Sequence, residues 1–162
     1  MGRKRPPGSS PKGSLGALRL IRETGSAAPP PHSLEQTLIR SPREVFVFMQ
    51  PHAEREEIEV FWILALDAQS RVTFDSPIVI TRGILNSSLV HPREVFRAAI
   101  VSGAAGIIVV HNHPSGDPKP SADDRAVTQQ LVAAGQLLDL PVHDHVIIGR
   151  STYASFAELG LL

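Results

Sequence analysis

The chain has 162 residues, of which 16 are basic and 16 acidic, so its formal net charge is zero when the histidines are neutral. This length suits one globular domain, and the balanced charge gives no single-sign field that would draw the whole molecule to nucleic acid or to a membrane. Cysteine is absent, which excludes disulfides, thiolate metal ligands and a cysteine nucleophile, so any metal must be held by His, Asp or Glu. No apolar run reaches membrane-spanning length and no secretory signal begins the chain, so we expect a cytoplasmic protein without membrane contact.

Residues 1–40 differ in composition from the rest. They are rich in Gly, Ser and Pro, and most of their charged side chains are basic: Arg3, Lys4, Arg5, Lys12, Arg19 and Arg22 stand against Glu23. Such a segment has too little apolar area to order itself, which predicts a disordered basic tail ahead of a domain at 41–162. The tail could make weak nucleic-acid contacts by neutralising phosphates, although a solvated leader explains the same composition.

The first regular elements follow Ser41. Ser41-Pro42-Arg43-Glu44 is a capping box with proline at the first helical position, so a short amphipathic helix should begin here and end at the polar break 51–57. Residues 58–66 are apolar enough for a strand covered on both faces, and a turn at 67–70 should connect it to an antiparallel partner at 72–81.

The remaining elements alternate between helix and strand. A loop at 83–89 precedes a helix at 92–102, a buried strand at 107–110, a helix from Ser121 to Leu138, a strand at 142–149 and a closing turn at 155–159. This order predicts an α/β domain with a mixed β-sheet flanked by helices.

The stretch from His111 to Asp124 carries the chemistry. In extended backbone, alternate side chains share a face, so His111 and His113 should point the same way after the apolar strand. A stiff proline-rich loop leads to the helix that starts at Ser121, with Asp124 in its first turn. If the loop folds back, two imidazoles and one carboxylate complete the ligand set of a catalytic zinc site with an open fourth position. Helix capping explains Ser121 and Asp124 when they are taken alone, but not the whole combination.

These residues also resemble a known family. The spacing of His111, His113, Ser121 and Asp124 is similar to the JAMM (JAB1/MPN-type) metalloprotease motif. The longer strings at 83–88, 91–96, 111–118 and 144–149 look like the bacterial RadC branch, and the likeness runs from about Ser41 to the C-terminus. The resemblance implies a JAB/MPN architecture, which is cytidine-deaminase-like, with Zn²⁺ as cofactor. Longer members carry an N-terminal region that is at most a remnant here, so a DNA-binding role of that region does not transfer.

The resemblance also implies a base and an oxyanion donor. On the sequence alone Glu59 is the last solvated residue of a polar run, but the family places its catalytic glutamate near the start of this strand, with Glu57 as the rival. Glu59 would take a proton from zinc-activated water and return it to the leaving amine, while the Ser121 hydroxyl would donate to the oxyanion. The implied reaction is hydrolysis of a peptide or isopeptide bond in an unidentified protein or peptide substrate.

A second class of function stays open. The historical family name suggests DNA metabolism, with the domain acting as a nuclease or as a binding module in repair or mobile-element complexes. The other candidate residues have ordinary structural explanations: His91 as a helix cap, His143 and His145 beside a strand, and Asn86, Ser87 and Ser88 in loop turns. Asp144 and His145 could instead orient a metal ligand through hydrogen bonds. The sequence does not settle the substrate or the oligomeric state.

Overall fold

The computed structural model describes residues 37–83 and 90–162. Its helices are α2 (Pro42–Ala53), α3 (Pro92–Val101) and α4 (Ala122–Leu137), and its strands are β1 (Val60–Leu66), β2 (Ile78–Arg82), β3 (Gly106–Asn112), β4 (Val142–Ile148) and β5 (Tyr153–Ser155). The strands form one five-stranded sheet in the order β2-β1-β3-β4-β5. The predicted α/β class with a mixed sheet is therefore confirmed.

The sheet is mixed because β3 and β4 run parallel while every other pair is antiparallel. The predicted partner of β1 is present but shorter than expected, since regular pairing begins at Ile78 and only an isolated bridge joins Leu66 to Val72. The intervening segment contains Pro77, which has no backbone N–H to donate to a ladder. The short strand β5 was not predicted, because residues 155–159 were expected to form only a turn.

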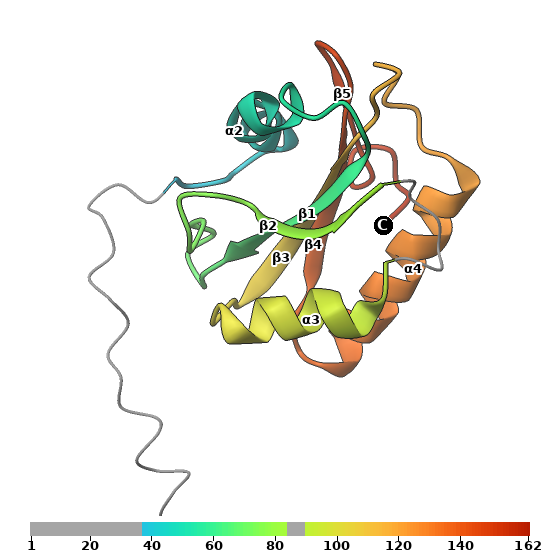
Figure 1. Ribbon diagram of the computed structural model, residues 1–162. Helices are drawn as coiled ribbons and strands as arrows, with labels where there is room; N and C mark the ends of the chain where they lie inside the picture. The colour runs from blue at the N-terminus through green and yellow to red at the C-terminus, as the bar shows by residue number, and fades with distance from the viewer. Residues whose placement is uncertain (1–36, 84–89) are drawn as a thin grey trace, which may run out of the picture. The chain divides into compact units, whose positions relative to one another are not determined.

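The two faces of the sheet bury separate halves of the core. Even-numbered residues of β1, such as Trp62 and Leu64, pack with α2, whereas odd-numbered residues such as Ile63 pack with α3 and α4. Figure 1 shows α2 on one side of the sheet and α3 with α4 on the other. The same alternation holds in β3, so His111 faces α4 and Asn112 faces the opposite way.

Helix α2 begins where the capping pattern places it. The Ser41 side chain accepts a hydrogen bond from the Glu44 backbone N–H at 3.3 Å. The predicted break at residue 51 was wrong, because the helix continues through Pro51 to Ala53. Proline removes one helical hydrogen bond, and here the carbonyl left without it belongs to Val47, whose side chain is exposed, so water can replace the lost donor.

The segment before α2 is part of the packed domain. Residues 37–40, which composition assigned to the tail, pair with the turn after β1 through hydrogen bonds from Ile39 N–H to the Ser70 carbonyl and from Val72 N–H to the Thr37 carbonyl, both at 2.9 Å. Ile39 is also buried. The remainder of the proposed tail and residues 84–89, including Asn86, Ser87 and Ser88, lie outside the described residues.

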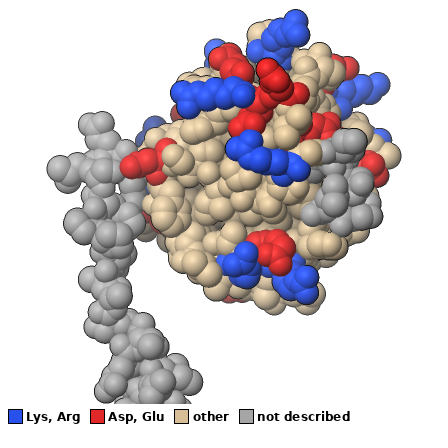
Figure 2. Space-filling model, in the orientation of Figure 1, with Lys and Arg blue, Asp and Glu red and all other residues tan. Residues whose placement is uncertain are grey.

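The surface of the described domain carries both signs of charge. On the face that Figure 2 shows, basic and acidic side chains of the described residues are interspersed. None of the helices in the described part of the chain combines the length and apolar character needed to cross a membrane.

Candidate metal centre

The end of β3 brings His111 and His113 together. Hydrogen bonding to β4 continues past the strand's last residue, because the His113 N–H donates to the Ile148 carbonyl at 2.9 Å. The backbone therefore stays extended, and the two side chains share a face. Their Nε2 atoms lie 2.9 Å apart. His111 is completely buried, with Phe61 of the neighbouring strand stacked on its ring, while His113 is partly exposed.

The first turn of α4 adds the carboxylate of Asp124. One oxygen, Oδ1, lies 3.2 Å from His111 Nε2, and the other, Oδ2, lies 3.6 Å from His113 Nε2. Ligands bound tetrahedrally at the usual zinc distances would be roughly 3.3 Å from one another. The three residues are the group of metal-ligating side chains that the described part of the chain brings together, with all ligand atoms within 4.8 Å.

Ser121 serves as the N-cap of α4. Its hydroxyl lies 2.6 Å from Asp124 Oδ2 and accepts from the Asp124 N–H at 3.1 Å, while the Ser121 N–H donates to Oδ2 at 2.7 Å. The capping box is thus fully formed, and it fixes the carboxylate that faces the histidines. In this arrangement the Ser121 hydroxyl donates its hydrogen bond to Asp124 Oδ2.

The environment shifts the three titrations in different directions. Burial lowers the pKa of His111, against the opposing effect of Asp124. The hydrogen bond to Asp124 raises the pKa of His113. Burial alone would raise the pKa of Asp124, but its bonds to both histidines outweigh burial and hold that pKa well below the usual range. Asp124 is consequently a carboxylate at neutral pH, as a metal ligand must be.

His113 is oriented by the loop that follows it. Its Nδ1 lies 2.7 Å from the Asp117 carbonyl oxygen. A carbonyl can only accept, so Nδ1 carries the hydrogen, and in the neutral ring the lone pair is on Nε2, which faces His111 and Asp124. Metal-ligating histidines commonly make this kind of contact through their other nitrogen.

Glu59 lies immediately before β1 and is partly buried. Its backbone is held on both sides by the Asn112 carboxamide, which accepts from the Val60 N–H at 2.7 Å and donates to the Ile58 carbonyl at 3.0 Å. Its negative charge favours the protonated form of both histidines: at His111 it opposes the larger effect of burial, which lowers the pKa, and at His113 it acts with the hydrogen bond to Asp124, which raises the pKa. Glu59 is therefore close enough to act electrostatically on the centre, while its rival Glu57 is exposed on the preceding loop.

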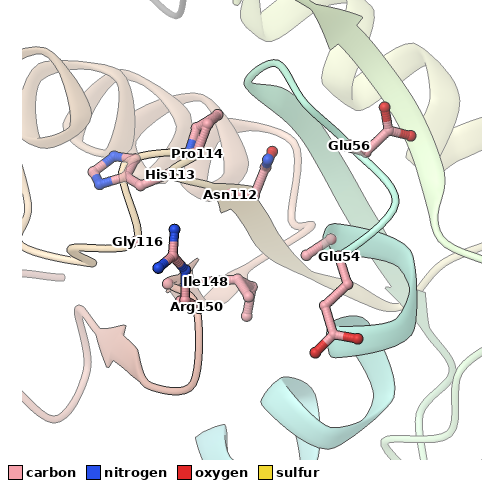
Figure 3. Close-up of a pocket in the computed structure, with 10 residues that line it drawn as sticks. Glu54, Glu56, Asn112, His113, Pro114, Gly116, Ile148 and Arg150 are labelled. Atoms are coloured by element: carbon pink, nitrogen blue, oxygen red, sulfur yellow. The ribbon is translucent and has the colours of Figure 1, made fainter.

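A pocket opens beside His113, at the ends of the parallel strands β3 and β4. Its volume is about 350 Å³. Figure 3 shows Arg150 on the side of His113 and Pro114, across the pocket from Glu54 and Glu56. The centre thus has a neighbouring recess that carries both signs of charge.

Of the three other histidines named as candidates from the sequence, one reaches the centre and two do not. His145 of β4 contacts His111, with 2.8 Å between His145 Nε2 and His111 Nδ1. His91 is the N-cap of α3 without a side-chain capping bond, and the exposed His143 lies over Gly106.

Asp144 does not contact the ligands. It holds the C-terminal segment, bonding the Ser155 hydroxyl at 2.6 Å and the Ala157 N–H at 2.9 Å. Burial raises its pKa against these bonds.

Sequence reasoning missed two contributors, Asn112 and Thr128. Asn112 was given no role, because a residue between two histidines that share a strand face points to the other face. The Thr128 hydroxyl contacts His145 Nδ1 at 2.6 Å. Thr128 lies four residues after Asp124, so the two share a helix face, and this spacing was the available signal.

The comparisons with known proteins agree with this fold. The model of a family described as a RadC-like JAB domain matches residues 39–161. A UPF0758 protein of Symbiobacterium thermophilum is 45% identical over 137 residues, covering 85% of this chain and 56% of the relative. UPF0758 proteins of Trichlorobacter lovleyi (46% over 122 residues, covering 75% and 52%) and Methanosarcina mazei (43% over 124 residues, covering 76% and 53%) are similar. The chain spans about half the length of these curated relatives.

Proposed function

Because the chain belongs to the family of RadC-like JAB domains, we propose that it is a zinc-dependent metallopeptidase that hydrolyses peptide or isopeptide bonds. The observation that supports this most is the convergence of His111 Nε2, His113 Nε2 and an Asp124 oxygen within 4.8 Å. Two imidazoles and one carboxylate are a known catalytic zinc set, whereas structural zinc sites use four protein ligands.

The donor chemistry fits a bound cation. Asp124 is ionised, and the Nε2 atoms of His111 and His113 lie only 2.9 Å apart. Two nitrogen lone pairs and a carboxylate at this spacing repel one another unless a proton or a metal lies between them. When bound, zinc would supply Lewis-acid chemistry, polarising a carbonyl and lowering the pKa of water.

Glu59 is the proposed base. It would accept a proton from the attacking water and deliver it to the leaving amine, which a carboxylate positioned beside the centre but outside the ligand set can do. The Asn112 carboxamide fixes the backbone on both sides of Glu59 and so limits where its side chain can reach.

Ser121 is the proposed oxyanion donor. To act in this way its hydroxyl would rotate from Asp124 Oδ2 toward the substrate, while its backbone N–H, at 2.7 Å, would still hold the carboxylate. The side chain is exposed at the helix start, so the rotation would cost its hydrogen bonds with the Asp124 carboxylate and N–H but would not require moving the core.

The test combines metal analysis with a matched pair of glutamate variants. The purified protein should retain about one zinc per chain, and His111→Ala with His113→Ala should lose it. Glu59→Gln should abolish hydrolysis and keep the zinc, whereas Glu57→Gln should behave like wild type. A proteome-wide comparison of cleaved termini in cells with wild type and with Glu59→Gln supplies candidate substrates. Stoichiometric zinc in the double variant, or equal activity in Glu59→Gln, would overturn the proposal.

A further inference from the structure

We propose that Thr128 and His145 are positioning residues that fix the tautomer of His111 and aim its Nε2 lone pair at the metal. This inference rests on the proposed metal site. It assigns a role to two buried polar side chains that the hydrolytic mechanism does not use.

The side chains of Thr128, His145 and His111 form a continuous series of short contacts. Thr128 Oγ1 lies 2.6 Å from the Asp124 carbonyl oxygen and 2.6 Å from His145 Nδ1. His145 Nε2 lies 2.8 Å from His111 Nδ1. All three side chains are buried, so water does not compete for these bonds.

The direction of each hydrogen follows from what each group can donate. The Asp124 carbonyl has no hydrogen, so the single hydroxyl hydrogen of Thr128 lies between the two oxygens. Thr128 Oγ1 must then accept from His145, which places a hydrogen on His145 Nδ1. The alternative, in which Thr128 donates to His145, would leave two oxygen atoms facing each other at 2.6 Å with no hydrogen between them.

The remaining step shows how the tautomer of His145 fixes the tautomer of His111. His145 lies between Phe156, stacked on its ring, and the edge of Phe61, an apolar setting in which a charged ring would be costly. A neutral His145 with its hydrogen on Nδ1 can only accept at Nε2. His111 therefore donates from Nδ1, and its Nε2 is left with a lone pair directed at Asp124 and His113.

Asp124 takes part at both ends of this arrangement. Its backbone carbonyl receives the Thr128 hydroxyl, and its carboxylate lies 3.2 Å from His111 Nε2. The first turns of α4 thus provide a ligand and also orient the histidine of β3 opposite to it. The orientation of His113 is fixed separately, by the Asp117 carbonyl. Changes at Thr128 should therefore leave the tautomer of His113 unaffected.

The experiment compares Thr128→Val, which removes the hydroxyl and keeps the branched shape, with Thr128→Ser, which keeps the hydroxyl. Zinc affinity is measured by competition with a chelator. Loss of a residue bonded directly to a ligating histidine usually weakens metal binding about 10- to 100-fold. Thr128 acts through His145, so we expect a loss near the lower end, about 10-fold, for Thr128→Val, with Thr128→Ser close to wild type. Equal affinity in Thr128→Val and wild type would overturn the inference.

The second readout needs neither zinc nor catalysis. Imidazole nitrogen NMR of the metal-free protein should find His111 and His145 both with hydrogen on Nδ1, and a mixture of tautomers for His111 in Thr128→Val. Hydrogen on Nε2 of His111 in the wild type would refute the proposed order even if the protein binds zinc. If no variant binds zinc but the tautomers are as stated, the metal proposal fails while the hydrogen-bond order stands.

Discussion

Asn112 allows a quantitative test of how the proposed base is held. Its carboxamide satisfies the buried Val60 N–H and donates to the Ile58 carbonyl. Asn112→Ala removes both bonds and leaves the Val60 N–H without a partner. A lost hydrogen bond costs about 1 kcal/mol and a buried unsatisfied donor about 1 to 3 kcal/mol, so the free energy of unfolding should fall by roughly 2 to 4 kcal/mol.

Asn112→Asp separates the two bonds. The carboxylate can still accept from Val60 but faces the Ile58 carbonyl without a hydrogen to donate, so strain falls on one side of Glu59 only. Urea unfolding at neutral pH measures both variants, and metal analysis accompanies it. Zinc content should stay at the wild-type level in each, because Asn112 points to the sheet face opposite His111.

Hydrolysis should decrease more than zinc binding in both variants, since the base and not the ligand set is displaced. A loss of stability below about 1 kcal/mol for Asn112→Ala would refute the conclusion that the Asn112 carboxamide holds the backbone on both sides of Glu59. Loss of zinc with hydrolysis retained per bound zinc would refute the separation of base and ligands.

The metal-free protein should become less stable as the pH falls below about 6.5, the ordinary histidine value. Burial depresses the pKa of His145, so the unfolded chain binds its proton first. His113 acts with the opposite sign: its pKa is raised, so its contribution is present below about 6.5 and is lost as the pH rises through the folded value. Denaturation between pH 5 and 8 should therefore show a steeper acid loss for His113→Gln, and an unchanged slope would contradict this. Gly135→Ala should cost about 1 to 3 kcal/mol, because its added carbon would lie 2.6 Å from a backbone oxygen. Gly106→Ala is the control, since there the carbon meets only the movable end of an exposed histidine side chain, and equal thermal stability of the two variants would refute the packing explanation.

Local pattern was sufficient for most of the fold. The capping sequence at Ser41 predicted the start of α2, and the apolar run before His111 predicted β3, because caps and strand alternation depend on neighbours along the chain. The predicted end of α2 was wrong because a helix can continue through Pro51 when the carbonyl that loses its N–H donor, here that of Val47, can bond water instead. The strand β5 was missed because its pairing is with β4.

The site was predictable where its members share one segment and less so where they do not. Spacing alone brought His111, His113 and Asp124 to attention. The roles of Asn112 and His145 depend on contacts between segments that the sequence keeps far apart, with 52 residues from Val60 to Asn112 and 34 from His111 to His145. Such contacts appear only when the strand order is known.

The position of β3 between β1 and β4 determines when the site can form during folding. Its two last residues, His111 and Asn112, serve opposite faces of the sheet, and both need β1 and β4 as neighbours. A chain whose central strands have not yet assembled has neither the aligned donors nor the restrained glutamate. Capture of the proposed metal and completion of the sheet should therefore occur together during folding, so the proposed hydrolytic activity would arise only in the native protein.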